Sequence, residues 1–92
     1  LAAICAAPSI LGKMGLFANK RFTCYPGWEK GIDGINGAEW TGAAVEQSEG
    51  LTTGRGLGTA MDFGLALVAK LCGSETAEKI KRGIQHPDTL YD

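Results

Sequence analysis

The chain opens on apolar positions without a polar break. Residues 1–5 read Leu-Ala-Ala-Ile-Cys, and a short continuous apolar run of this kind is typical of a central strand in a parallel sheet. We therefore predict a fully buried strand over residues 2–5. Because a central strand needs neighbours on both of its edges, we also expect that the domain includes residues before Leu1, as a missing or separate N-terminal half.

The rest of the chain alternates between strand-like and helix-like patterns. Strands are predicted over residues 21–24, 43–47 and 51–53, and helices over residues 8–14, 28–35, 60–71 and 74–82. Pro8 suits the first turn of a helix, where its missing N–H costs nothing. The glycine-dense segment 54–58 is predicted to be a loop. Strands that alternate with helices predict an α/β sandwich.

The predicted helix over residues 60–71 is apolar on nearly every side. Such a helix is normally buried between a sheet and a further layer, so we expect a second layer or a second subunit to cover it. Thr59 is the predicted N-cap, and Asp62 stands three residues later, as in a capping box.

Composition narrows the class of protein. The chain has 92 residues and a formal net charge of −1, so charge gives no reason to expect binding to nucleic acid or to an anionic membrane. No apolar run approaches the ~18 residues of a membrane span. The three cysteines lack the spacing of a metal site, so neither a metal nor another cofactor is expected. Unpaired cysteines suit a reducing cytoplasm.

Cys5 is the candidate catalytic residue. It ends the predicted buried strand, has small neighbours, and precedes the start of a helix. This is the layout of a nucleophile elbow with Cys in place of Ser, in which free N–H groups at the helix start favour a thiolate. The backbone N–H of Ala6 is the expected oxyanion support. The alternative is that Cys5 is only a small buried apolar residue.

Two segments resemble the ThiJ/PfpI superfamily, in its Parkinsonism-protein-like branch. The first is Ala-Ala-Ile-Cys-Ala-Ala-Pro at residues 2–8, which is similar to the family's elbow. The second is Leu-Thr-Thr-Gly-Arg-Gly-Leu-Gly-Thr-Ala-Met-Asp-Phe at residues 51–63, which is similar to the strand, loop and helix that follow in the family. The two segments stand at the family's separation, and the resemblance covers essentially the whole chain.

The resemblance implies a flavodoxin-like three-layer sandwich, similar to class I glutamine amidotransferases, of which residues 1–92 form the C-terminal half. It also implies a homodimer and glyoxalase- or deglycase-type chemistry through Cys5 on a small aldehyde or an aldehyde adduct. Two alternatives remain open. One is a non-enzymatic sensor of oxidative stress or a chaperone that uses Cys5 oxidation, and the other is an amidotransferase-like hydrolase.

The candidate site-lining residues are Tyr25, Cys24, Arg55, Gly56 and Leu57. Tyr25 stands where several family members have a histidine, and a phenol is a poor base at neutral pH, which puts a Cys–His dyad in doubt. Leu57 replaces a frequent proline. Cys24 is a candidate resolving thiol, and Arg55 is expected to pair with a carboxylate in preference to a substrate anion. His86, which follows the last predicted helix, is expected to have a structural or an exposed role. The family's glutamate contact to the cysteine would lie before Leu1.

Overall fold

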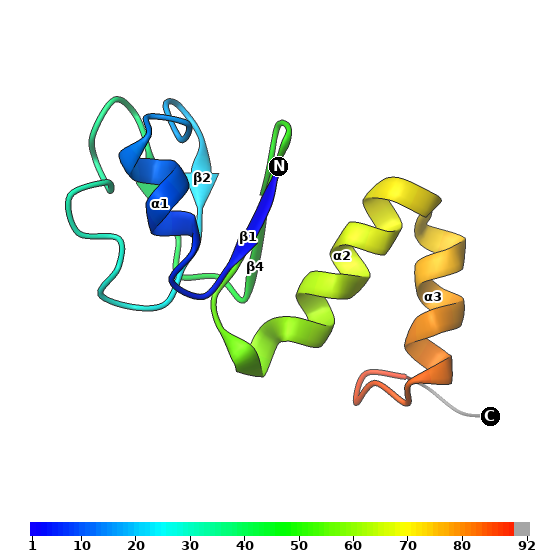
Figure 1. Cartoon of the computed structure of the whole chain (residues 1–92). Coiled ribbons are helices and arrows are strands. Elements are labelled where there is room, and N and C mark those ends of the chain that lie inside the picture. The colour runs from blue at the N-terminus through cyan, green and yellow to red at the C-terminus, as the bar shows by residue number, and fades with distance from the viewer. Residues whose placement is uncertain (90–92) are drawn as a thin grey trace.

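Short strands and three helices follow one another along the chain in the computed structural model, which describes residues 1–89 (Figure 1). The strands are β1 (Ala2–Ile4), β2 (Arg21–Phe22), β3 (Glu39–Trp40), β4 (Val45–Ser48) and β5 (Leu51–Gly54). The helices are α1 (Pro8–Lys13), α2 (Ala60–Cys72) and α3 (Ser74–Gly83), and a 3-10 turn, η1 (Leu57–Thr59), precedes α2. The predicted α/β class is confirmed.

The strands form two small sheets. In one, β5 lies between β1, to which it runs parallel, and β4, to which it runs antiparallel; in the other, β2 pairs with β3 in parallel. A buried threonine pair ties the two sheets together, since the Thr23 N–H donates to Thr53 Oγ1 at 2.9 Å. The chain segments that follow β1, β2 and β5 are thereby held close to one another, and these segments carry the candidate site.

β1 is an edge strand of the described sheet. Ala2 is exposed, while Ala3 and Ile4 are half-buried. The prediction of a fully buried central strand is therefore wrong for residues 1–89 taken by themselves, because no described strand pairs with the outer edge of β1.

The segment between β2 and β3 differs from its prediction. Residues 28–35 form successive turns in place of the predicted helix, because Gly31 and Gly34 adopt left-handed backbone angles of φ +84° and +80°, which interrupt a right-handed helix. The strand β3 was not predicted. At two residues, Glu39 and Trp40, it is too short to produce a detectable alternation.

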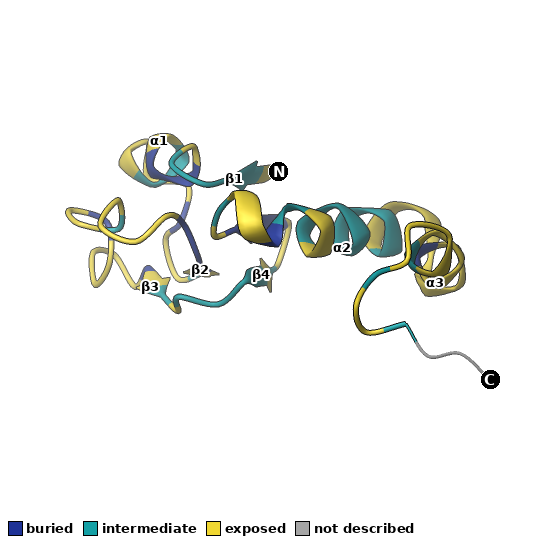
Figure 2. Ribbon diagram, turned by 90° about the horizontal axis from the view of Figure 1, so that it is seen from below, coloured by how far each residue is buried: buried dark blue, intermediate teal, exposed yellow. Residues whose placement is uncertain are grey.

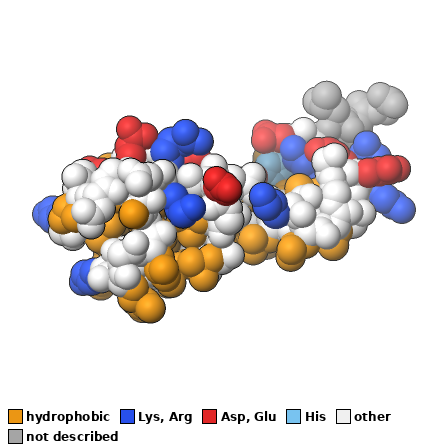
Figure 3. Space-filling view, turned by 90° about the horizontal axis from the view of Figure 1, so that it is seen from above, with side chains coloured by type: hydrophobic (Ala, Val, Ile, Leu, Met, Phe, Trp, Pro, Cys, Tyr) orange, Lys and Arg blue, Asp and Glu red, His pale blue; other side chains and the backbone are white. Residues whose placement is uncertain are grey.

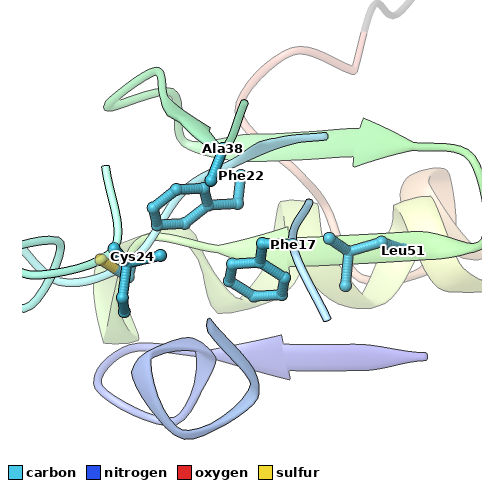
Figure 4. Packing of buried hydrophobic residues seen from close by; sticks show 6 residues of the cluster. Phe17, Phe22, Cys24, Ala38 and Leu51 are labelled. Atoms are coloured by element: carbon cyan, nitrogen blue, oxygen red, sulfur yellow. The ribbon is translucent and has the colours of Figure 1, made fainter. Parts of the chain in front are cut away.

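A small apolar core lies between α1 and the strands. Its buried members are Phe17, Phe22, Cys24, Ile32, Ala38 and Leu51, and Figure 4 shows most of them gathered above α1. The rings of Phe17 and Phe22 pack with centroids 4.7 Å apart, a favourable aromatic geometry. This core fixes α1, and therefore the turn that leads into it, against the end of β2.

The helices α2 and α3 form a hairpin that extends away from the core, and the molecule measures 47 × 23 × 16 Å. None of the α2 residues is buried, as the half-buried and exposed colours of Figure 2 show. Met61, in the first turn of this helix, is 65% exposed. The expectation of a buried helix is not met within the described residues, because α2 packs mainly against α3 and against the strands β5 and β4.

Apolar side chains consequently remain on the surface. Figure 3 shows them along one edge of the molecule, from the α1 lobe to the helical hairpin. The exposed apolar residues of α2 and α3 include Met61, Leu71 and Ile80. Among residues 1–89, no helix combines the length and the apolar character that a bilayer crossing requires.

The predicted capping box is also wrong. The Thr59 hydroxyl interacts with Gly56, donating to its carbonyl at 3.0 Å and accepting its N–H at 3.3 Å. The Asp62 carboxylate turns away and binds His86 Nε2 at 2.7 Å. Thr59 therefore shapes the turn before α2, while Asp62 holds the segment that follows α3.

Candidate functional site

Cys5 lies at the turn between β1 and α1. Its backbone adopts φ +66°, a left-handed angle that is unusual for a residue with a side chain and that costs on the order of 1–3 kcal/mol. Its N–H donates to the Gly54 carbonyl at 3.0 Å, and its carbonyl accepts the Tyr25 N–H at 2.8 Å. Both neighbouring segments thus hold the turn in this conformation, and the Cys5 side chain is left half-buried.

The elbow hypothesis requires a backbone N–H without a hydrogen-bond partner directly after Cys5. Pro8 begins α1 and is preceded by Ala7 at the N-cap position. The Ala7 N–H bonds to the Ile4 carbonyl at 3.2 Å, whereas the Ala6 N–H donates to no partner among residues 1–89. The Ala6 N–H, directly after the thiol residue, therefore has no partner among the described residues, as the oxyanion hypothesis requires.

Four of the five predicted lining residues meet at the end of β2. Tyr25, Arg55, Gly56 and Leu57 line one shallow hollow, together with Pro26, Gly58 and Thr59. The Tyr25 side chain is 52% exposed. Cys5 does not line the hollow itself; it adjoins the hollow through its backbone bond to Tyr25. The structure thus places these four residues together beside the elbow.

Arg55 is held by backbone carbonyls. Its guanidinium Nη1 donates to the Gly42 carbonyl at 2.9 Å, and its backbone N–H donates to the Ala44 carbonyl at 3.0 Å. Arg55 makes no ion pair among the described residues, so the expected pairing with a carboxylate is not found there. No described carboxylate pairs with its positive charge, and Arg55 lines the hollow.

Cys24, the fifth predicted residue, points into the core and does not line the hollow. It is fully buried, and this burial raises the pKa of its thiol to about 11, with the Glu29 carboxylate and the Cys5 thiol adding to the rise. The Trp40 indole N–H acts in the opposite direction. That N–H is buried without a hydrogen-bond partner among residues 1–89, so its contact with the sulfur is weaker than a full hydrogen bond. Cys24 is a protonated thiol at neutral pH.

Gly54 is a site residue that sequence reasoning missed. A Cβ at this position would lie 2.8 Å from Ile4 and 2.9 Å from Phe63, so only glycine allows β1, β5 and α2 to meet here. Its carbonyl also anchors Cys5. A glycine inside a strand pattern often marks such a close approach of chain segments, and this was the available signal.

His86 lies outside the elbow region. Its ring is nearly buried, binds Asp62 through Nε2, and accepts the Asp88 N–H through Nδ1 at 3.1 Å. The acceptor role of Nδ1 places the proton on Nε2, which therefore donates to Asp62. This arrangement agrees with a structural role for His86.

Comparisons with known proteins agree with the geometry. Residues 1–70 match the family model described as the DJ-1/PfpI family. Protein dj-1beta of Drosophila melanogaster is 34% identical over 85 residues, which cover 91% of this chain and 44% of that protein. The chain therefore spans about half the length of such relatives, and it corresponds to the C-terminal half of their domain.

Solved structures show the same fold. The crystal structure of Drosophila melanogaster DJ-1beta matches with a TM-score of 0.82 and 33% identity over 98% of this chain and 46% of that one. A mutant of a DJ-1 superfamily protein from Salmonella typhimurium matches with a TM-score of 0.83 and 28% identity over 94% and 46%. Oxidized DJ-1 of Toxoplasma gondii matches with a TM-score of 0.82 and 28% identity over 91% and 45%. The chain, with its half-domain fold and its cysteine turn, belongs to the DJ-1/PfpI family.

Proposed function

We propose that this chain carries the cysteine half of a glyoxalase- or deglycase-type site that acts on small reactive aldehydes or on their adducts. The observation that carries the proposal is the strained turn at Cys5, with its half-buried thiol and φ +66°. A left-handed angle at a residue with a side chain is costly, and such outliers cluster at functional sites. Two independent backbone bonds, to Gly54 and from Tyr25, maintain it.

The proposed chemistry begins with the Cys5 thiolate. Its sulfur forms a bond to the aldehyde carbon while the carbonyl π electrons move to oxygen, giving a hemithioacetal-like intermediate. The Ala6 N–H, which has no partner among the described residues, directly follows the nucleophile and can donate a hydrogen bond to the developing oxyanion. Arg55, whose charge no described carboxylate neutralises, would attract an anionic substrate group into the hollow beside Tyr25.

The proton transfers need a base that the described residues do not supply near Cys5. Tyr25 is a phenol, and His86 is engaged with Asp62. We propose that an N-terminal half of the domain, in the same or a separate chain, supplies a carboxylate to Cys5 and pairs with the free edge of β1. We also propose that the protein is a homodimer, which the exposed apolar edge supports. We place it in a reducing compartment such as the cytoplasm, which the free cysteines support.

The test is turnover of methylglyoxal, followed as loss of the aldehyde and appearance of lactate. This chain is assayed alone and with an N-terminal half taken from a relative. We expect activity only in the combined protein, and we expect Cys5→Ser to abolish it, because a hydroxyl is a far weaker nucleophile than a thiolate. Cys72→Ser is the matched control, since Cys72 is exposed and lies outside the site. Activity that survives in Cys5→Ser would contradict the proposal.

A second candidate is a sensor of oxidative stress that uses Cys5 without turnover. The likeness to oxidized DJ-1 of Toxoplasma gondii favours it, as does the half-exposed thiol beside a free N–H that could receive a sulfur oxygen. Peroxide modification of Cys5 before Cys72, combined with no methylglyoxal turnover in the combined protein, would select this candidate. No specific observation favours the amidotransferase-like hydrolase.

A further inference from the structure

The two cysteines nearest the candidate site are brought together by backbone pairing. The Tyr25 N–H donates to the Cys5 carbonyl at 2.8 Å, and Cys24 is the residue directly before Tyr25. Standard bond lengths then limit the separation of the Cys5 and Cys24 Cα atoms to roughly 7.5 Å. Cα atoms in disulfides are usually about 4.4–6.8 Å apart, so the backbone already brings the pair close to the range of a disulfide.

The two thiols differ in how accessible they are to solvent, and this difference suggests a different role for each. Cys5 is half-buried and accessible to a small oxidant, whereas Cys24 is fully buried. An external oxidant therefore reaches Cys5 first. Cys24, enclosed among core residues, can react only with a group close to it in the protein, and the backbone bond between Cys5 and Tyr25 places Cys5 beside it.

We propose that Cys24 is the resolving thiol of Cys5, so that mild oxidation closes an internal Cys5–Cys24 disulfide. This inference rests on the proposed reactivity of Cys5 and adds a reversible oxidised state to the same site. Because the disulfide consumes Cys5 in a form that reductants can restore, it would protect the thiol from irreversible oxidation.

The reaction balances with a peroxide as the oxidant. The Cys5 thiolate attacks one peroxide oxygen, the O–O bond breaks, and Cys5 becomes a sulfenic acid while hydroxide or an alkoxide leaves and takes a proton from solvent. The Cys24 sulfur then attacks the Cys5 sulfur, an S–S bond forms, the S–O bond breaks, and the hydroxyl leaves as water with the proton of the Cys24 thiol. Two thiols lose two electrons in total, and the peroxide gains them.

The rate of closure should depend on pH through Cys24. Its thiol has a pKa raised to about 11 by burial, by the Glu29 carboxylate and by Cys5, and the Trp40 indole opposes the rise. The attacking species is the thiolate, whose fraction rises about tenfold per pH unit below the pKa. Closure is therefore slow near neutral pH and accelerates as the pH rises toward 10. At neutral pH, excess peroxide competes by taking Cys5 on to the sulfinic acid.

Tryptic peptides make the disulfide directly visible. Cleavage places Cys5 in peptide 1–13, Cys24 in peptide 22–30 and Cys72 in peptide 71–79. The chain, combined with the N-terminal half of a relative as in the turnover assay, is treated with one equivalent of hydrogen peroxide at pH 7, 8 and 9, quenched with iodoacetamide and digested without reductant. We expect peptides 1–13 and 22–30 to appear as a linked pair, with a yield that rises with pH and that disappears on reduction.

Variants test whether Cys24 is the thiol that forms the linked pair with Cys5. In Cys24→Ala the linked pair must be absent, and Cys5 sulfinate must accumulate faster than in the unmodified chain. Cys72→Ser must behave as the unmodified chain does. If Cys24→Ala does not fold, the linked pair in the unmodified chain and its pH dependence still decide the question.

Two results would overturn the inference, and they are distinct from a failure of the proposed function. Cys5 oxidised to sulfinate while Cys24 stays reduced at every pH would reject the resolving role and leave the reactivity of Cys5 intact. A disulfide from Cys5 to Cys72 would also reject it. If Cys5 is oxidised no faster than Cys72, the proposed function itself fails.

Discussion

A single glycine sets how closely three elements approach the candidate site. Gly54 ends β5, its carbonyl accepts the Cys5 N–H, and the space where a Cβ would stand is filled by Ile4 and Phe63. Those two side chains come from β1 and from α2. The conformation of Cys5 therefore depends on a residue without a side chain 49 positions later in the sequence.

We expect Gly54→Ala to destabilise the chain by about 1–3 kcal/mol, as overpacking does in other cores. Gly64 is the matched control, because it lies inside α2 and a Cβ there meets no atom within 4 Å. Gly64→Ala should stabilise the chain by about 0.5–1 kcal/mol through helix propensity. Urea unfolding of the two variants measures both changes, and equal effects of the same sign would contradict this account of Gly54.

At the scale of elements, the helical hairpin is closed by a side-chain contact at its open end. His86 follows α3, and its Nε2 donates to Asp62 in the first turn of α2 at 2.7 Å. The His86 side chain is only 8% exposed, while that of Asp88, its other carboxylate neighbour, is 77% exposed at a distance of 3.9 Å. The Asp62 contact is therefore the one that holds the segment after α3 against α2.

We expect His86→Ala to release this segment. The loss of a hydrogen bond to a charged group costs about 1.5–3 kcal/mol, so amide hydrogen exchange over residues 84–89 should accelerate by roughly ten- to a hundredfold. Asp88→Asn is the control and should change exchange little, because an exposed pair contributes about 0–1 kcal/mol. If exchange over residues 84–89 is unchanged in His86→Ala, the contact does not hold the segment.

At the scale of the whole molecule, few apolar side chains are buried in the core and many are exposed on the surface. Among residues 1–89, the core contains six buried residues, the outer edge of β1 has no partner strand, and α2 has no buried residue. Exposed apolar surface of this kind favours association, and an unpaired strand edge favours pairing with another chain.

We therefore expect residues 1–92, expressed alone, to associate and to unfold without a sharp transition. Sedimentation velocity should show species larger than a monomer, and a dye that binds apolar surface should fluoresce. Coexpression with the N-terminal half of a relative should reduce both signals, because that half would cover β1. The opposite outcome, a monomer that unfolds cooperatively without a partner, would show that this chain folds independently.

Local patterns along the chain were enough to predict the α/β class, the positions of α1, α2 and α3, and the turn at Cys5. Each of these depends on neighbours in sequence: Pro8 begins a helix, small residues surround the cysteine, and a long apolar stretch forms α2. The grouping of Tyr25, Arg55, Gly56 and Leu57 was also predicted, through the family resemblance, because strand ends in this fold converge.

Contacts between distant segments could be known only from the folded chain. Local patterns do not reveal that the Arg55 guanidinium binds the Gly42 carbonyl, or that Asp62 pairs with His86 instead of capping α2. The hydrogen-bond partners of these polar side chains depend on which backbone and side-chain groups folding brings within reach. The burial of Cys24 and the exposure of α2 also depend on the folded chain, because burial depends on which layers pack together. Cys24 lies in the core, whereas the described residues cover α2 on one side only.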